Sequence, residues 1–157
     1  MKKTIKDVNV SGKRVIVRCD FNVPLDEKRN ITDDSRITAS LPTIQYLVDK
    51  GAHILLLSHL GRPKGEADMK YSLLPVAHML SGIFGSDFMF YSSPFVVDDE
   101  AKRVAAHLGP GQIMLLENVR FRWEETKNEP SFSRELAGLA DIFVNDAFGS
   151  AHRAHCS

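Results

Sequence analysis

The chain has 157 residues, of which 43% are hydrophobic and 25% are charged, as in an average globular domain. Lysine plus arginine equals aspartate plus glutamate at 20 each, so no overall field would attract nucleic acid or an anionic membrane. Apolar runs such as Ile54–Leu57 are too short to cross a bilayer, and no export signal follows Met1. The only cysteines, Cys19 and Cys156, argue against a disulfide framework and fit a reducing cytosol, so we expect a cytoplasmic protein.

Short apolar runs alternate with helical patterns along the chain. The runs predict strands at Val15–Val17, Ile54–Leu57, Phe88–Tyr91, Ile113–Leu116 and Ile142–Val144. Most of them are apolar throughout, which is typical of strands that are covered on both faces. Helical spacing of apolar residues fills the segments between them, at Ile37–Val48, Leu73–Phe84, Val97–Leu108 and Phe132–Leu139. The alternation predicts an α/β fold, a three-layer Rossmann-like domain with a parallel sheet and helices on both faces.

Residues typical of helix ends flank these patterns. Glycine follows three of them, where a left-handed residue is favoured, at Gly51, Gly85 and Gly109. Ser72 and Ser131 are expected N-caps. Pro42 falls within the first pattern and is expected to lie in a first turn or to bend the helix.

Three loops after predicted strands are long for a compact domain, at Asp20–Asp34, His59–Ser72 and Glu117–Ser131. Long loops of this kind are usually functional or disordered. All three leave the carboxyl ends of parallel strands, where open α/β sheets bind their ligands. This edge of the sheet is therefore the expected site.

The residues expected at that edge are Asp20, Asn22, Arg36, His59, Arg62, Glu117, Asn118, Arg120, Asn145, Asp146, His152 and Arg153. Several arginines and two histidines thus meet in a protein without net charge, and arginine's planar fork suits phosphate and carboxylate oxygens. We expect a small ligand with several negative charges. Arg36 opposes the dipole of its own helix, although a structural ion pair with Asp33 or Asp34 is an equally simple explanation for it.

Other chemistry finds no support in the sequence. No G-x-x-x-x-G-K-[ST] motif and no G-x-G-x-x-G after a strand are present, so neither nucleotide fingerprint occurs. The tail residues His152, His155 and Cys156 supply only three soft ligands at a chain end. We expect no metal site.

From about Asp7 to the last residue the chain resembles phosphoglycerate kinase. The motifs that carry the resemblance are residues 18–24, 35–37, 41–44, 58–65, 116–121 and 145–149, with His152 and Arg153. The resemblance implies a glycolytic transferase that moves a phosphoryl group between 1,3-bisphosphoglycerate and ADP, giving 3-phosphoglycerate and ATP.

By the same resemblance, residues 1–157 form a truncated N-terminal phosphoglycerate-binding domain, and the C-terminal nucleotide-binding domain is absent. Mg²⁺ and ATP or ADP would bind mainly to that absent domain, with none on this chain, which would be inactive alone and marginally stable. The expected partner is the small-molecule substrate, with no nucleic acid and no membrane, and the expected state is a monomer.

The resemblance also assigns the site. Arg36 would be catalytic and lie nearest the transferred group. The substrate-binding residues would be Asp20, Phe21, Asn22, Arg36, His59, Leu60, Gly61, Arg62, Arg120 and Arg153. Among them the arginines and His59 would hold the 3-phosphate and carboxyl end, and Asp20 and Asn22 the hydroxyl side.

Two other functions remain open. One is a non-catalytic anion-binding α/β module. The other is an interaction domain whose arginines dock an acidic partner. The stop at Ser157 inside a strand-end loop favours the kinase fragment over the first, and the long polar loops disfavour the second.

Overall fold

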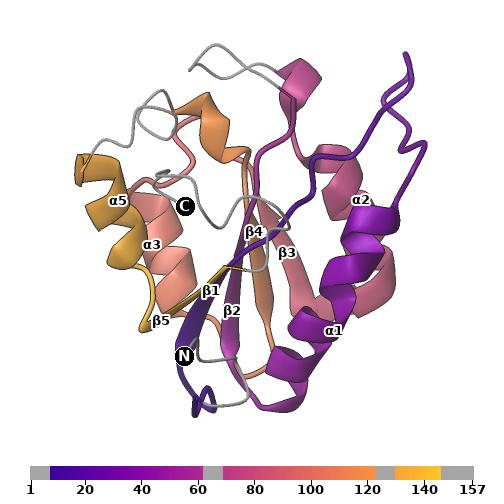
Figure 1. The fold of residues 1–157 in the computed structure, drawn as a ribbon. Helices are drawn as coiled ribbons and strands as arrows, with labels where there is room; N and C mark the ends of the chain where they lie inside the picture. Colours follow the sequence, from indigo (N-terminus) through magenta and orange to yellow (C-terminus); the bar gives the residue numbers. More distant parts are fainter. Residues whose placement is uncertain (1–7, 62–68, 123–129, 146–157) are drawn as a thin grey trace.

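The computed structural model describes residues 8–61, 69–122 and 130–145 and shows a parallel sheet between two layers of helices (Figure 1). The described sheet has five strands in the order β3-β4-β2-β1-β5, and every pairing is parallel. The strands are β1 Arg14–Arg18, β2 His53–Leu57, β3 Phe88–Tyr91, β4 Ile113–Leu116 and β5 Ile142–Asn145. All five predicted strands are confirmed.

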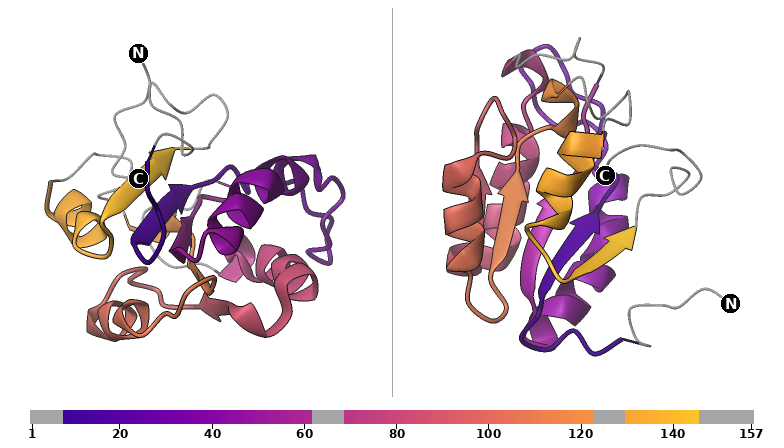
Figure 2. Two further views of the ribbon diagram at one scale, coloured as in Figure 1. Left: turned by 90° about the horizontal axis from the view of Figure 1, so that it is seen from below. Right: turned by 90° about the vertical axis from the view of Figure 1, so that its left-hand side faces the viewer.

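The described helices lie on both faces of the sheet. They are α1 Ser35–Asp49, α2 Leu74–Phe84, α3 Asp99–Ala106 and α5 Pro130–Ala137, with short 3₁₀ helices η2 Met69–Tyr71, η3 Gly85–Asp87 and η4 Val119–Phe121. Helices α1 and α2 cover one face, and α3 and α5 cover the other (Figures 1 and 2). The predicted three-layer Rossmann-like architecture is confirmed.

Successive residues of the central strands enter two separate hydrophobic cores. In β2, Ile54 and Leu56 pack with α1 and α2, whereas Leu55 and Leu57 pack with α3 and α5. All four side chains are fully buried. A strand with a core on each face has no reason to alternate apolar and polar residues, which explains the continuous apolar runs.

Some helix boundaries differ from the sequence expectation. Gly51 and Gly85 adopt positive φ after α1 and α2, as predicted. Gly109 does not, because α3 ends early at Ala106 and the left-handed residue is Gly111, with a φ of 77° at the turn into β4. Pro42 lies in the middle of α1, which continues to Asp49 although proline cannot donate to the carbonyl of Thr38.

Both expected N-cap serines have other positions. Ser72 precedes the N-cap residue of α2, which is Leu73, and the Ser72 hydroxyl donates to the Glu117 carboxylate (2.7 Å). Helix α5 begins at Pro130, so Ser131 is inside it. Proline is favoured as a first helical residue because its missing N–H would have no helical acceptor there.

The order of the strands places the site. From β1 to β3 the chain moves one way across the sheet through α1 and α2, and it returns to β5 through α3 and α5 on the other face. The loops after β2 and β4 therefore leave neighbouring strands toward opposite faces. Open α/β sheets bind ligands at the carboxyl ends of the strands where this switch occurs.

Candidate functional site

The first loop of the site follows β1. The N–H of Cys19 donates to the carbonyl of Leu57 (2.9 Å), which continues the pairing of β1 with β2 past the strand end. The side chain of Phe21 is fully buried and anchors the loop. The N–H of Asn22 donates to Oδ1 of Asp20 (3.2 Å). This turn fixes the Asp20 carboxylate at the carboxyl edge of the sheet.

Arg36, in the first turn of α1, lies against this turn. Its Nη1 donates to Oδ1 of Asp20 (3.3 Å) and to the carbonyl of Asn22 (2.7 Å), and half of the side chain is exposed. Its ion-pair partner is thus Asp20. The pKa of Asp33 lies below its ordinary value chiefly because the backbone N–H and hydroxyl of Ser35 donate to its carboxylate, and the charge of Arg36 contributes less.

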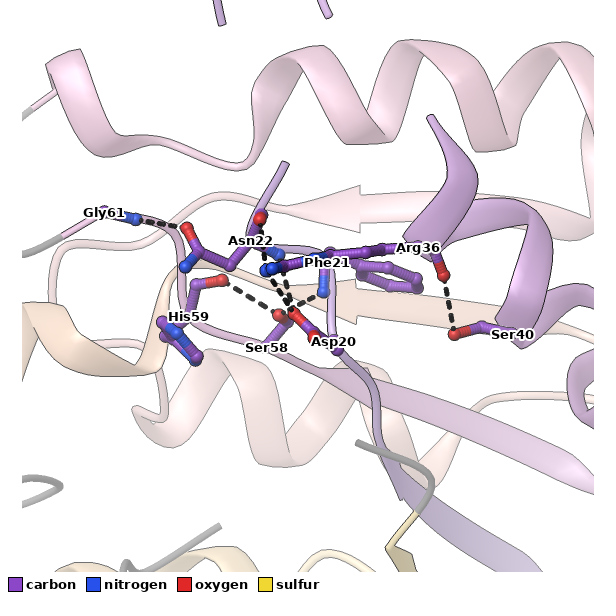
Figure 3. A network of polar contacts seen from close by, with 8 residues as sticks. All are labelled: Asp20, Phe21, Asn22, Arg36, Ser40, Ser58, His59 and Gly61. Atoms are coloured by element: carbon purple, nitrogen blue, oxygen red, sulfur yellow. Dashed lines mark hydrogen bonds and ion pairs between the residues drawn. The ribbon is translucent and has the colours of Figure 1, made fainter. Parts of the chain in front are cut away.

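The loop after β2 is tied to the loop after β1 (Figure 3). The N–H of Gly61 donates to Oδ1 of Asn22 (2.8 Å), and the buried Ser58 hydroxyl accepts from the N–H of Phe21 (2.9 Å). The same hydroxyl donates to the carbonyl of His59 (2.9 Å). These bonds join the ends of two neighbouring strands into one polar surface.

Gly61 is required at its position for two reasons. Its φ is 63°, a conformation that other L residues rarely adopt. A Cβ atom there would also lie 2.4 Å from Cδ1 of Tyr71. The Gly61 backbone therefore lies directly against the Tyr71 ring.

The loop after β4 adds the third side of the site. The N–H of Val119 donates to the carbonyl of Ser58 (3.1 Å), and Nδ2 of the buried Asn118 donates to the carbonyl of Leu60 (2.7 Å). Oδ1 of Asn118 accepts from the N–H of Arg120 (3.0 Å). Arg120, on η4, is therefore placed beside the loop that carries His59 and Leu60.

The structure brings together most of the residues predicted for the site. Hydrogen bonds join Asp20, Asn22, Arg36 and Gly61 directly, and the backbones of His59 and Arg120 belong to the same network. The side chains of Phe21 and Leu60 are buried, so these two residues present mainly backbone to the edge. Arg62, Arg153, Asp146 and the tail residues His152, His155 and Cys156 lie outside the described residues.

Comparison with known proteins shows which family the chain belongs to. The family model for phosphoglycerate kinase matches residues 5–157. The chain belongs to the phosphoglycerate kinase family. It is 58% identical to a phosphoglycerate kinase of Clostridioides difficile (strain 630) over 99% of this chain, and 56% identical to one of Clostridium botulinum (strain Hall). These matches span 39% of the length of each relative.

Solved structures of the family share the fold. Phosphoglycerate kinase from Coxiella burnetii superposes with a TM-score of 0.84 at 39% identity, over 98% of this chain and 37% of that one. The enzyme from Pyrococcus horikoshii OT3 has the same TM-score at 31% identity, over 97% of this chain and 38% of that one. The α/β architecture is thus that of a part of a phosphoglycerate kinase.

Three residues that organise this edge of the sheet were not assigned a role from the sequence. Ser58 and Asn118 connect the strand ends through the bonds above. Glu117 is a buried carboxylate that lies at the end of β4, 1% exposed. Glu117 and Asn118 were expected at this edge from their place after a strand, but no local pattern indicates their partners, which are up to 58 residues away.

Proposed function

We propose that this chain forms the phosphoglycerate-binding half of a phosphoglycerate kinase, an enzyme that transfers a phosphoryl group between 1,3-bisphosphoglycerate and ADP. The observation that carries the proposal is the network of Asp20, Asn22, Arg36 and Gly61, which joins two strand ends and a helix start at the carboxyl edge. A half-exposed guanidinium held in this way suits a phosphorylated acid.

Arg36 is the proposed catalytic residue. Its two bonds both use Nη1, so Nη2 and Nε have no partner among the described residues. Asp20 and the Asn22 carbonyl orient the guanidinium while these other donors remain available for oxygens of the transferred group. Phosphoryl transfer needs positioning and stabilisation of charge on the moving group, and an oriented arginine contributes to both.

The proposed reaction needs no general base on this chain. When 3-phosphoglycerate is the acceptor, the nucleophile is its carboxylate, which is ionised near neutral pH. No proton has to be removed from it. The residues of this chain therefore have to hold and orient the acid rather than activate it.

The other site residues bind the acid in this proposal. The 3-phosphate and carboxyl end would contact His59, Arg62, Arg120 and Arg153, and the hydroxyl side would contact Asp20 and Asn22. Phe21, Leu60 and Gly61 would shape the surface with their backbone, since the first two have buried side chains.

Mg²⁺ and the nucleotide are assigned to the rest of the enzyme. In ranges 8–61, 69–122 and 130–145 no group of three or more His, Cys, Asp or Glu side chains is placed to hold a metal ion. In this proposal the residues of this chain act on the acid. Glycolytic chemistry, a cytoplasmic setting and a monomeric state belong to the same proposal.

No helix in the described ranges is long and apolar enough to span a membrane.

A set of calorimetric titrations tests the proposal. We expect the chain to bind 3-phosphoglycerate and not magnesium-ATP. Inorganic phosphate and an acidic peptide serve as competitors. Equal binding of phosphate and 3-phosphoglycerate would favour a general anion module, and preference for the peptide would favour an interaction domain. A folded sample that binds none of them would contradict the assignment of the site to this chain.

A further inference from the structure

The buried carboxylate of Glu117 has more donors than any other carboxylate in the described part of the chain. Oε1 accepts from the N–H groups of Leu73 (2.8 Å) and Asn118 (2.9 Å). Oε2 accepts from the hydroxyls of Ser72 (2.7 Å) and Ser92 (3.0 Å). These partners come from the loops after β2, β3 and β4, so one side chain joins three strand ends.

Asn118 extends this connection to the start of the loop after β2. Its Nδ2 donates both to the carbonyl of Leu60 (2.7 Å) and to the carbonyl of Tyr71 (2.8 Å). Together Glu117 and Asn118 hold Leu60 at the beginning of this loop and Tyr71 to Leu73 at its end. The Tyr71 ring lies where a side chain at position 61 would be, so the position of Gly61 depends on the same bonds of Glu117 and Asn118.

The place of the Glu117 and Asn118 side chains in the sheet connects them with the site. They lie between β2 and β4, where the chain leaves neighbouring strands toward opposite faces of the sheet. The loop that they close carries His59, Leu60 and Gly61, and Gly61 contacts Asn22 of the site network. The Glu117 carboxylate is 1% exposed and accepts hydrogen bonds from four donors. Because the loss of any donor would leave this buried group poorly solvated, the carboxylate holds its four partners in one arrangement.

We propose that Glu117 is a positioning residue for the phosphoglycerate site: it does not touch the ligand, and it fixes Ser72 and Leu73, next to the Tyr71 that lies beside Gly61, against the end of β4. The inference rests on the proposed function for its ligand. Its structural part, the anchoring of Gly61, does not depend on any ligand.

Two substitutions distinguish the effect of the hydrogen bonds of Glu117 from the effect of its negative charge. Glu117→Ala removes all four bonds, and we expect the affinity for 3-phosphoglycerate to fall about tenfold, as for the loss of one well-made interaction. In Glu117→Gln the amide oxygen accepts from the two N–H groups, and the amide NH₂ donates to Ser72 and Ser92, whose hydroxyls can rotate to accept. We expect affinity within about threefold of the unchanged chain, because the geometry is retained.

Asp98→Ala is the matched control. Asp98 is also a partly buried carboxylate, which accepts from the Tyr91 hydroxyl (2.6 Å), the Ser93 hydroxyl (2.8 Å) and the N–H of Ala101 (2.9 Å). It caps α3, and its bonds to Tyr91, Ser93 and Ala101 do not involve the residues that follow β2. Its loss should lower stability without changing affinity, so it controls for general destabilisation.

The experiment measures affinity and amide hydrogen exchange on the same samples, well below the melting temperature of each variant. In Glu117→Ala we expect weaker binding and faster exchange at Gly61, with exchange at Leu55 in the core of β2 unchanged. Unchanged affinity in this variant, or equal effects in Asp98→Ala, would overturn the inference. If the unchanged chain does not bind 3-phosphoglycerate, the proposed function fails for this chain. The exchange at Gly61 then decides on Glu117: faster exchange in Glu117→Ala alone supports its role, and unaltered exchange rejects it.

Discussion

At the amino edge of the sheet, several turns are held by backbone hydrogen bonds and by glycines with positive φ, whereas at the carboxyl edge side chains also cross between the strand ends. Gly111 donates to the carbonyl of Ala52 (2.7 Å), and Gly12 donates to the carbonyl of Gly51 (3.2 Å). All three glycines have positive φ. At the opposite edge the corresponding contacts run through Asn22, Arg36 and Glu117.

This difference between the two edges predicts where a substitution changes stability alone and where it also changes function. Turns held by backbone bonds need no particular side chain. The amino edge also has two side-chain acceptors, Asp141 for the N–H of Arg14 (3.1 Å) and Gln112 for the N–H of Gly109 (2.7 Å). At the carboxyl edge, polar side chains satisfy one another across strands and keep some donors exposed, as Arg36 does. Substitutions at the amino edge should therefore change stability alone, and those in the carboxyl-edge network of Asn22, Arg36 and Glu117 should also change binding or turnover.

The largest effect should follow from Arg36→Ala, tested in a full-length enzyme that contains this chain. We expect turnover to fall by about 10³-fold, in the range reported for arginines that stabilise transferred phosphoryl groups. Binding of 3-phosphoglycerate should remain mostly intact, because the other cationic residues hold the acid. Steady-state kinetics and calorimetry measure the two effects separately.

Arg103→Ala is the control for Arg36. Arg103 is an exposed arginine of α3 that forms an ion pair with Glu100, one turn away on the same helix. Its removal takes away one positive charge without touching the carboxyl-edge network, so turnover should not change. Unchanged turnover in Arg36→Ala would remove Arg36 from the catalytic role.

A pair of glycine substitutions compares the two edges directly. At Gly61 an added Cβ meets the Tyr71 ring at 2.4 Å, whereas at Gly51 the nearest atom is Cβ of Pro110 at 3.8 Å. Both residues have positive φ, so each alanine should cost about 1 kcal/mol of stability in backbone strain alone. Only Gly61→Ala should also weaken binding of 3-phosphoglycerate, by about tenfold. Chemical denaturation and calorimetry on the two variants test this, and equal affinities would show that the Gly61 loop does not shape the site.

The smallest effect is expected at Asp98, a polar group at the carboxyl edge that we predict does not serve the site. Burial alone would raise its pKa, but the donors from Tyr91, Ala101 and Ser93 outweigh burial, and the pKa is lowered. The stabilisation from a lowered carboxyl pKa is present above the unfolded value of about 3.9 and is lost as the pH falls through the folded value.

The matching experiment is Asp98→Asn with urea denaturation from pH 7 down to pH 3. At pH 7 the variant should be less stable by about 1 kcal/mol, since the amide cannot accept all three bonds. The difference should shrink as the pH falls below the unfolded pKa of Asp98. A difference that stays constant with pH would show that the ionised carboxylate is not what stabilises the cap. Affinity for the acid should be the same in both proteins.

The sequence predicted the sheet well because each strand carries its own signal. Val15–Val17 and Ile113–Leu116 are buried on both faces, and such runs are recognisable without knowing what covers them. The helix ends were harder. Gly109 was predicted to be left-handed after the helix, but α3 ends sooner than its apolar pattern, and the residue with positive φ is Gly111 at the turn into β4.

The site was predicted as a location and only partly as a network. Strand ends and long loops indicated the edge, and arginines suggested an anionic ligand. The bond between Gly61 and Asn22 spans 39 residues, and the bond between Ser72 and Glu117 spans 45. No local pattern encodes such pairs, because their geometry depends on the strand order. Local sequence therefore predicts Ser72 as a helix cap, whereas its hydroxyl donates to the buried carboxylate of Glu117.

The most direct test of the account follows the titration of this chain with 3-phosphoglycerate amide by amide. If the carboxyl edge is the site, the resonances of Asn22, Gly61 and Arg120 will shift in proportion to binding, and those of Gly51 and Gly111 at the amino edge will not. Shifts confined to the amino edge, or no shifts at saturating acid in a folded sample, would contradict the claim that these strand ends form the phosphoglycerate site.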